Sequence, residues 1–344
     1  MARANQPALL VVTLLLLAPL TPAQSYTITD LGLASGGGRA INAQGDVLAD
    51  NGLLAFFWSP TRGSVNLQAL PGGDTTVAGG INAAGQISGQ STIYNSYTEH
   101  AALWIDGNVQ DLGTLPGGVT SWATSINAAG DVAGAADGSG FQPNAMIWTK
   151  RAGMRTLGTL PGGSYSVAFG INRRDQVVGY SDVADGTSYA YIWSKAGGMR
   201  ELPSLSGGGG SSGNAINEFG HVAGGSGCGG GCIHAVLWNR KPGVTEDLGL
   251  LPGSSFSSAY GLNNKDQVVG SASFSSSDHA FVWSSASGIQ DLNNLIPPNS
   301  GWLLVYAFAI NDHGQITGQG TLNGETHAYL LTPAGTTVSG ERNN

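Results

Sequence analysis

The sequence predicts an all-β protein, a seven-bladed β-propeller built from four-stranded antiparallel blades. One phrase recurs along the chain, as "DLGTLPGGVTSWATSIN" from residue 111 and "TLGTLPGGSYSVAFGIN" from residue 156. Each unit contains four short apolar segments separated by clusters of Gly, Asn and Pro, the pattern of strands joined by tight turns. Glycine supplies 55 of the 344 residues and charged residues only 10%. Four strands in a repeat of about 45 residues are typical of a propeller blade.

Two sequence markers count the repeated units. An asparagine after Ile or Leu follows the first strand of each unit at intervals of 40 to 48 residues: Asn42, Asn82, Asn127, Asn172, Asn217, Asn263 and Asn311. A tryptophan ends the strand two places further on in six units: Trp58, Trp104, Trp148, Trp193, Trp238 and Trp283. The seventh copy, "HAYLL" from residue 327, lacks the tryptophan. The markers together give seven units.

The strand before each asparagine carries small residues on one face. They are Ala40, Gly80, Ser125, Gly170, Ala215, Gly261 and Ala309, and two residues earlier Gly38, Ala78, Ala123, Ala168, Gly213, Ala259 and Ala307. Residues two apart on a strand share a face. Because radiating blades are closest together near the axis, we expect this strand to be the innermost and the tryptophan strand to lie further out.

Each asparagine is expected to open an Asx turn, in which its side chain accepts a hydrogen bond from the backbone two residues on. Three residues later stands a residue that tolerates left-handed dihedral angles, glycine in five units and Asp175 or Asp266 in the other two.

The chain ends supply one blade between them. The segment "YTITDLG" at the start resembles the "VQDLGTL" strand but has no tryptophan strand before it. The segment "HAYLLTPAG" at the end resembles the tryptophan strand but has no "DLG" strand after it. We expect residues 26–32 to pair with residues 327–333, because closing the ring removes exposed sheet edges. The predicted domain covers residues 24–335, after a signal peptide (1–23) and before a polar tail (336–344).

The N-terminal segment and the charge predict where the protein works. Arg3 precedes an apolar run of 13 residues, Ala8 to Leu20, which is too short to span a bilayer and is followed by small residues suited to cleavage. We therefore expect an exported protein, extracellular or periplasmic. The net charge of −8 disfavours nucleic acid and membrane partners, whose phosphates require clustered Lys and Arg. We expect a monomer.

The two cysteines, Cys228 and Cys232, stand in "GSGCGGGCIHA". In an exported protein a close pair predicts a disulfide. Closing so short a ring contributes only about 2 kcal/mol. The alternative interpretation is a soft-metal site formed by Cys228, Cys232 and His234.

The phrases "DLGTLPGG", "INAAGDVAG" and "HAFVW" resemble the HAF-repeat family of bacterial extracellular proteins, named for the tripeptide seen here at residues 279–281. The resemblance covers nearly all of residues 26–335. It implies an exported protein with a β-propeller-like fold, and it implies no activity. Most copies here depart from the tripeptide, as in "HAA", "NAM" and "YAY".

Residues able to perform chemistry are few and mostly repeated. His100, His234, His279 and His327 hold equivalent places in four units, so we expect them to be structural and too far apart to share an ion. The "NAAGD" turn offers too few oxygen ligands for calcium. The zinc motif H-E-x-x-H is absent, and the one match to the nucleophile motif G-x-S-x-G, at residues 209–213, stands in a glycine-rich run between strand-like segments and not ahead of a helix. The sequence predicts no cofactor, no metal and no catalytic residue.

Function is expected on the variable loops, because loops on a rigid scaffold commonly carry it. These loops follow "LPGG" or precede "HA", and we expect both sets at one end of the ring. The candidate ligand-binding residues are aromatic: Trp122, Tyr165, Phe256, Trp302, Tyr94 and Tyr97. The alternative is that these rings only pack the loops.

The favoured function is a non-catalytic binding or surface-interaction module for a glycan or a protein. One alternative is a polysaccharide-active enzyme, a lyase or hydrolase, using unrepeated polar groups such as Arg39, Asp74 or Asp182. The other is a structural protein of the cell exterior.

Overall fold

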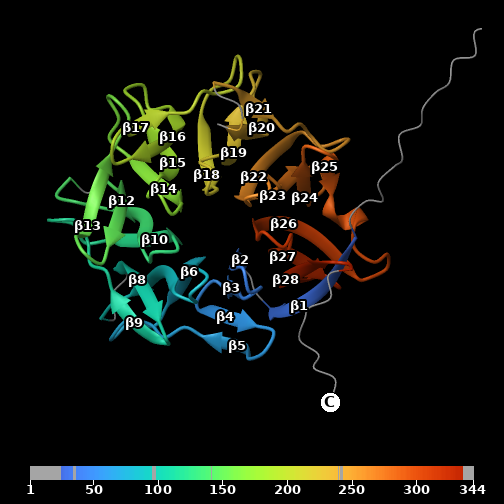
Figure 1. Ribbon diagram of the computed structural model, residues 1–344, viewed down its shortest axis with the longest axis horizontal. Helices are drawn as coiled ribbons and strands as arrows, with labels where there is room; N and C mark the ends of the chain where they lie inside the picture. Colours follow the sequence, from blue (N-terminus) through green and yellow to red (C-terminus); the bar gives the residue numbers. More distant parts are fainter. Residues whose placement is uncertain are drawn as a thin grey trace, which may run out of the picture.

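The computed structural model describes residues 25–33, 36–94, 98–140, 142–238, 240 and 243–335. It shows seven four-stranded antiparallel sheets arranged as blades around a central axis (Figure 1). The seven-bladed propeller predicted from the repeat is therefore confirmed. The expected signal peptide (1–23) and tail (336–344) lie outside the described residues.

The blades follow one another along the chain, and each begins with its innermost strand. Blades 1 and 2 contain β2 (Gly37–Ile41), β3 (Val47–Asp50), β4 (Ala55–Ser59) and β5 (Gly63–Asn66), then β6 (Thr76–Ile81), β7 (Ile87–Thr92), β8 (Glu99–Ile105) and β9 (Asn108–Asp111). Blades 3 and 4 contain β10 (Ser121–Ile126), β11 (Val132–Ala136), β12 (Asn144–Thr149) and β13 (Gly153–Gly158), then β14 (Ser166–Ile171), β15 (Val177–Asp182), β16 (Ser188–Ser194) and β17 (Gly198–Glu201).

The second half of the ring repeats this order. Blades 5 and 6 contain β18 (Ser211–Ile216), β19 (Val222–Gly227), β20 (Ile233–Trp238) and β21 (Thr245–Asp247), then β22 (Phe256–Leu262), β23 (Val268–Ser273), β24 (Asp278–Ser284) and β25 (Gly288–Asp291). Blade 7 contains β26 (Trp302–Ile310), β27 (Ile316–Leu322), β28 (Glu325–Pro333) and, as its outer strand, β1 (Tyr26–Leu33). A short 3-10 helix, η1 (Leu292–Asn294), precedes blade 7. Across the described residues, no helix has the length and apolar character needed to cross a membrane.

The first and last strands close the ring as the sequence predicts. Antiparallel β1 and β28 pair from Tyr26 opposite Pro333 to Leu33 opposite His327, with a bulge after Asp30. Figure 1 shows β1, in blue, beside β28, in red. Since β1 takes the outer place in blade 7, the first strand of the domain and the last belong to one sheet.

Blade packing explains the size gradient in the sequence. A Cβ added at Gly38 would lie 2.0 Å from Oγ1 of Thr317, and one added at Gly80 would lie 3.0 Å from Cα of Ser125. Both neighbours belong to adjacent blades, so larger residues are excluded near the axis. Further out, the tryptophans fill the widening gaps and are at most 7% exposed: Trp104, Trp148, Trp193, Trp238 and Trp283.

The repeated asparagines form a closed ring of hydrogen bonds between blades. In each blade Nδ2 donates to the backbone oxygen of the next blade's asparagine, and the last bond, from Asn311 to Asn42, completes the circle at 2.9 Å. Each Oδ1 also accepts from the backbone N–H groups two and four residues on, as Asn172 does from Arg174 and Gln176. The predicted Asx turns are thus present. The position three residues after each asparagine has a positive φ in all seven turns.

Four equivalent histidines join the third strand of a blade to its fourth. Nδ1 lies 2.7 to 2.9 Å from the nearest carboxylate oxygen in the pairs His100–Asp111, His234–Asp247, His279–Asp291 and His327–Asp30. The last pair links β28 to β1 and so fastens the ring closure. Each aspartate also accepts a bond from the backbone N–H two residues on. This arrangement accounts for the repeated histidines and for the four aspartates that pair with them.

The two ends of the ring differ in the segments that form them. One end, the loop face, carries the turns at 70–73, 115–118, 160–163, 205–208 and 251–254 together with the loops between second and third strands. The other end, the asparagine face, carries the Asx turns. Five large apolar side chains exposed at the loop face are Leu53, Tyr94, Val119, Ile233 and Phe256. The variable segments therefore share one end of the ring, as expected.

Candidate functional site

A cleft of about 1050 Å³ lies on the loop face and is centred on blade 5. Its floor consists of β18, β19, the glycines at 207–210 and the loop at 229–232. One wall is Tyr180 of blade 4, and the other is formed by Phe256 and Tyr260 of blade 6 with Tyr306 of blade 7. A cleft of this size is at the upper end for small-molecule sites, which measure about 300 to 1,000 Å³.

The cleft exists because blade 5 lacks side chains where other blades have them. Eight residues after the asparagine stands Gly225, where blades 2, 4 and 7 carry Gln90, Tyr180 and Gln319. Five residues before the asparagine stands Ser212, where blade 3 has a tryptophan. The missing side chains leave blade 5 hollow between better-filled neighbours. The glycine-rich segment "GGGGSSG", residues 207–213, forms part of this floor.

Aromatic rings and hydroxyl groups alternate along the cleft walls. The hydroxyl of Tyr306 donates to Asp278 at 2.5 Å, and the hydroxyls of Tyr260 and Ser271 are 3.3 Å apart. The hydrogen bond to the Asp278 carboxylate, followed by burial, raises the pKa of Tyr306 to about 12. Tyr306 is therefore neutral at physiological pH and available as a polar, uncharged wall.

The cleft lining has a pronounced charge bias. Asp278 is its one carboxylate, and the lining contains no Lys, Arg or His. Seven serines supply most of the remaining polar groups: Ser188, Ser211, Ser212, Ser257, Ser258, Ser271 and Ser273. Since a bound anion would meet a carboxylate without a compensating cation, the cleft suits an uncharged or cationic ligand.

The six aromatic residues proposed from the sequence are not gathered at one point. Phe256, which is 41% exposed, lines the cleft. Tyr165 lies behind the cleft wall, with its hydroxyl 3.4 Å from that of Tyr180. Burial, and next the hydrogen bond with Tyr180, raise the pKa of Tyr165. Tyr94 is 79% exposed on the loop face above blade 2.

The two tryptophans outside the repeated position lie on inner strands. Trp122 is half-buried on β10 opposite Ala135. Trp302 packs against the core of blade 7, edge-on to the rings of His327 and Tyr329. Neither lines the cleft. Tyr97 lies outside the described residues.

The three polar groups considered for catalysis have structural partners. Arg39 pairs with Asp50 at 3.0 Å and stacks over Phe308. Asp74 accepts a hydrogen bond from Thr92. Asp182 accepts the backbone N–H groups of Ser164 and Tyr165, which hold the turn before β14. Although burial raises the pKa of Asp182, these hydrogen bonds lower it further than burial raises it, so the carboxyl is ionised.

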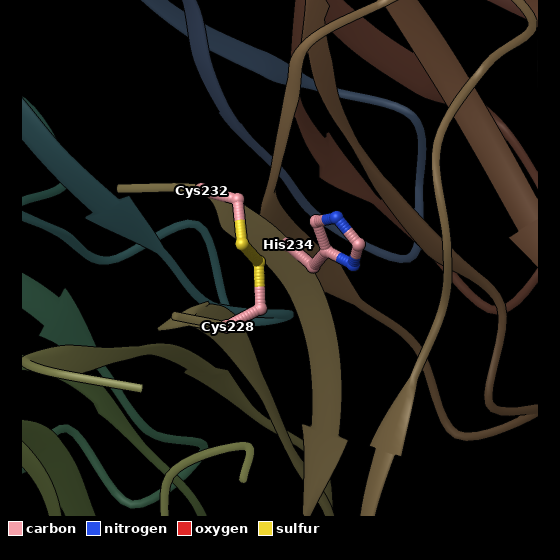
Figure 2. A group of neighbouring side chains, drawn as sticks. All are labelled: Cys228, Cys232 and His234. Carbon is pink, nitrogen blue, oxygen red and sulfur yellow. A yellow bond between two sulfur atoms is a disulfide. The ribbon is translucent and has the colours of Figure 1, made fainter. Parts of the chain in front are cut away.

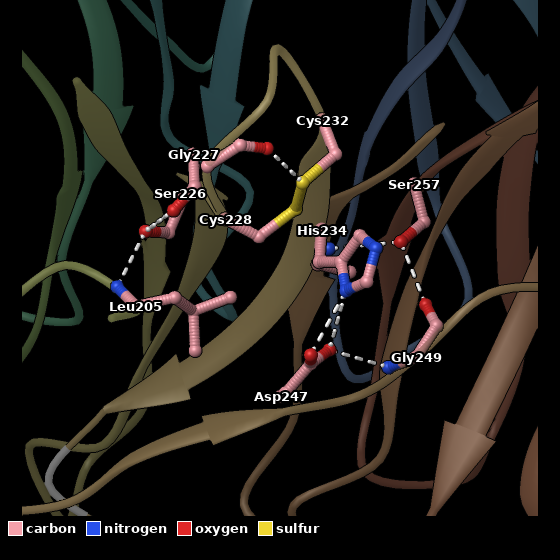
Figure 3. The surroundings of a disulfide bond; sticks show 11 residues. Leu205, Ser226, Gly227, Cys228, Cys232, His234, Asp247, Gly249 and Ser257 are labelled. Atoms are coloured by element: carbon pink, nitrogen blue, oxygen red, sulfur yellow. Dashed lines mark hydrogen bonds and ion pairs between the residues drawn. A yellow bond between two sulfur atoms is a disulfide. The ribbon is translucent and has the colours of Figure 1, made fainter. Parts of the chain in front are cut away.

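Cys228 and Cys232 form a disulfide, which confirms the pairing predicted from the sequence. The bond closes the loop between β19 and β20, and Cys232 reaches the cleft edge. Figure 2 shows the His234 ring beside the two sulfur atoms. Figure 3 shows that Nδ1 of the same ring bonds to Asp247, which also accepts the N–H of Gly249.

Sequence reasoning overlooked Tyr180, Tyr260, Tyr306 and Asp278, which form most of the cleft wall. Tyr260 occupies the position three residues before the asparagine, a row that also holds Phe169 and Phe308 around the axis. The sequence contained this information. The residue three positions before each asparagine varies in size from glycine to tyrosine, while the residues two and four positions before it are small in every repeat. Comparing each repeat position for missing side chains would have indicated blade 5.

No protein-family model matches the chain, and neither does any curated protein. Solved structures share the fold at low sequence identity. Virginiamycin B lyase from Staphylococcus aureus matches with a TM-score of 0.51 and 12% identity, covering 89% of this chain and 99% of that one. Oligogalacturonate lyase from Vibrio parahaemolyticus gives 0.52 and 11%, covering 90% and 94%.

A third match is the propeller domain of the Trilobed protease from Pyrococcus furiosus, with a TM-score of 0.53 and 8% identity, covering 90% of this chain and 94% of that one. That domain is described as having an open velcro topology, whereas here β1 pairs with β28. At these sequence identities the structural similarity shows the propeller fold alone. The function has to be inferred from the residues of the cleft.

Proposed function

We propose that this chain is an exported, non-catalytic binding propeller whose cleft over blade 5 takes a neutral glycan. The observation that carries the proposal is the combination of aromatic walls with a serine-rich floor in a cleft that has no basic residue. The C–H faces of a sugar pack on aromatic rings, whose faces are electron-rich, and its hydroxyls bond to Ser and Tyr. Tyr and Ser together also form adaptable binding surfaces in other proteins.

The charge of the lining supports a neutral sugar over a uronate. Asp278 would repel a carboxylate, and the lining offers no guanidinium or ammonium group to bind one. The net charge of −8 acts in the same direction at longer range. A neutral oligosaccharide avoids both penalties.

The polar groups support binding without turnover. Asp278 is the one carboxylate of the cleft lining, and it accepts a hydrogen bond from Tyr306. Glycoside hydrolysis uses a pair of carboxyl groups, and the lining offers no second one. Arg39 and Asp182, considered for catalysis, hold other parts of the fold. Membership of the HAF-repeat family and export by a signal peptide remain part of the proposal and rest on the repeat phrases and the N-terminal segment.

Calorimetric titration of the purified chain tests the proposal. Neutral hexasaccharides of glucose, xylose and mannose are compared with an oligogalacturonate of equal length. We expect at least one neutral series to bind and the uronate to bind at least tenfold more weakly. Binding of the uronate alone, or of a protein partner and none of the glycans, would show that the ligand class is wrong.

A cleft-filling variant localises the site. Gly225→Tyr places a residue that blade 4 accommodates at the same position, Tyr180, so the sheet should tolerate it. We expect it to weaken glycan binding at least tenfold. Tyr94→Ala removes an exposed ring on the same face outside the cleft and should leave affinity within twofold. Trp302→Ala should lower Tm without a separate effect on affinity, because Trp302 packs on the core.

A further inference from the structure

We propose that Cys228, Cys232 and His234 form a binding site for a thiophilic d¹⁰ cation, Zn²⁺ or Cu⁺, when the disulfide is reduced. The two sulfur atoms and one ring nitrogen of His234 lie within 4.8 Å of one another (Figure 2). Two thiolates and an imidazole are ligands that such ions prefer. The loop at 229–232 also forms part of the cleft floor, so the cation site adjoins the cleft proposed above for a glycan.

The bond to Asp247 holds His234 in a tautomer that suits a metal ligand. Its Nδ1 lies 2.8 Å from Asp247 Oδ2, and a carboxylate only accepts, so Nδ1 carries the proton in this bond. In the neutral ring this leaves the Nε2 lone pair free. Metal-bound histidines in proteins commonly donate their other N–H to a carboxylate in this way, which fixes the tautomer and the ring orientation. Asp247 is itself held by the N–H of Gly249 at 2.8 Å (Figure 3).

Blade 5 differs from blades 6 and 7 in what the histidine ring contacts. The same His–Asp pair recurs in blades 6 and 7, where the histidine ring packs against an aromatic ring. The ring centroids are 4.7 Å apart for Phe274 and His279, and 5.9 Å apart for Trp302 and His327. In blade 5 the "CGGGC" loop places two sulfur atoms there instead. The histidine and aspartate therefore serve the fold in every case, and the cysteines are the local addition.

The loop allows the small movement that coordination requires. Zn–S bonds of about 2.3 Å and Zn–N bonds of about 2.0 Å place ligand atoms of one ion roughly 3.5 Å apart. The sulfurs must therefore separate, and the histidine nitrogen must approach by about 1 Å. Three consecutive glycines, Gly229, Gly230 and Gly231, all with positive φ, join the cysteines without side chains to obstruct this. Gly230 and Gly231 are exposed, so the ion has a path from solvent.

The redox step balances with a dithiol reductant. The disulfide takes two electrons and two protons from a dithiol of the thiol–disulfide oxidoreductase class, which becomes a disulfide itself. Two cysteine thiols result. Binding of the ion then displaces both thiol protons and leaves two thiolates and neutral His234 as ligands. In the reverse exchange, a disulfide of the same oxidoreductase class takes two electrons from the two thiolates and two protons from solvent and becomes a dithiol, which restores the Cys228–Cys232 bond and releases the ion.

Anaerobic metal titration tests the site. The intact protein is reduced with a phosphine, desalted, and titrated with Zn²⁺ or Cu⁺ against a competing chelator, and with Co²⁺ for its thiolate charge-transfer absorption. We expect one equivalent to bind to the reduced protein and none to the oxidised protein. The Zn²⁺ and Cu⁺ arms identify which ion binds more tightly.

Matched variants assign the ligands. Cys228→Ser with Cys232→Ser should abolish binding, and its melting curve shows whether the ring is folded. His234→Asn, which copies Asn144 in blade 3, should weaken binding at least tenfold, and His279→Asn should leave it unchanged. If the reduced protein binds no more tightly than the double serine variant, or if His234→Asn binds as well as the unchanged protein, the proposed site is wrong.

Discussion

Replacing Asn172 with alanine tests whether the asparagine ring holds the propeller together. Asn172 is 2% exposed and makes four hydrogen bonds. Oδ1 accepts from the backbone N–H groups of Arg174 and Gln176 at 3.0 and 3.1 Å, and Nδ2 donates to the Gln176 side chain and, across the blade boundary, to the Asn217 carbonyl at 3.0 Å. Alanine leaves three backbone groups without these partners. At about 1 kcal/mol each, the free energy of unfolding should fall by about 3 kcal/mol.

Urea denaturation followed by circular dichroism measures this loss as a lower midpoint at an unchanged slope. Asn144→Ala is the matched control, because Asn144 is a half-buried strand residue whose bonds to Gln142 and Ser164 lie at the surface. It should change stability by no more than about 0.5 kcal/mol. A loss below about 1 kcal/mol for Asn172→Ala, or one equal to that of Asn144→Ala, would refute the stabilising role of the ring.

Three further perturbations test other parts of the structure. Deleting residues 24–32 should lower Tm more than deleting residues 337–344, because β1 completes blade 7; equal values of Tm would contradict the closure. Asp182→Asn should cost less than about 1 kcal/mol at pH 7. Because the folded-state pKa of Asp182 is lowered, this cost is present above the unfolded pKa and should vanish as the pH falls through the folded value, whereas a cost independent of pH would argue against the charge. Loss of the disulfide through Cys228→Ser with Cys232→Ser should cost about 2 kcal/mol. Complete unfolding would mean that the disulfide stabilises the fold by more than the loop-closure entropy of its short ring can supply.

Repetition made the fold predictable from the sequence. A seven-fold pattern of small residues fixes which strand is innermost, because only small side chains fit where Gly38 and Gly80 meet neighbouring blades. The split of blade 7 followed from the unmatched segments at the chain ends. The disulfide followed from the spacing of the cysteines. Each of these features is local or periodic, so it can be read without knowing which surfaces meet.

Contacts between repeats were harder to predict. The Asx turn at Asn172 was expected, but its bond to Asn217 joins residues 45 positions apart and depends on how the blades stack. The histidines were expected to be structural, but their aspartate partners were not predicted. Each aspartate lies on the neighbouring strand, and the register of the two strands determines which residue faces the histidine. The cleft was not predicted because it arises from an absent side chain at Gly225, whereas the predicted site rested on aromatic residues that are present.

The most direct test of the proposed function combines retention with turnover. The purified chain and its Gly225→Tyr variant are passed over immobilised neutral polysaccharides, and the same polysaccharides are incubated with the protein in solution and examined for new chain ends by mass spectrometry. We expect retention of the unchanged protein, loss of retention for the variant, and no product. Formation of shortened or unsaturated chains would contradict a non-catalytic role, and equal retention of both proteins would contradict binding in the cleft over blade 5.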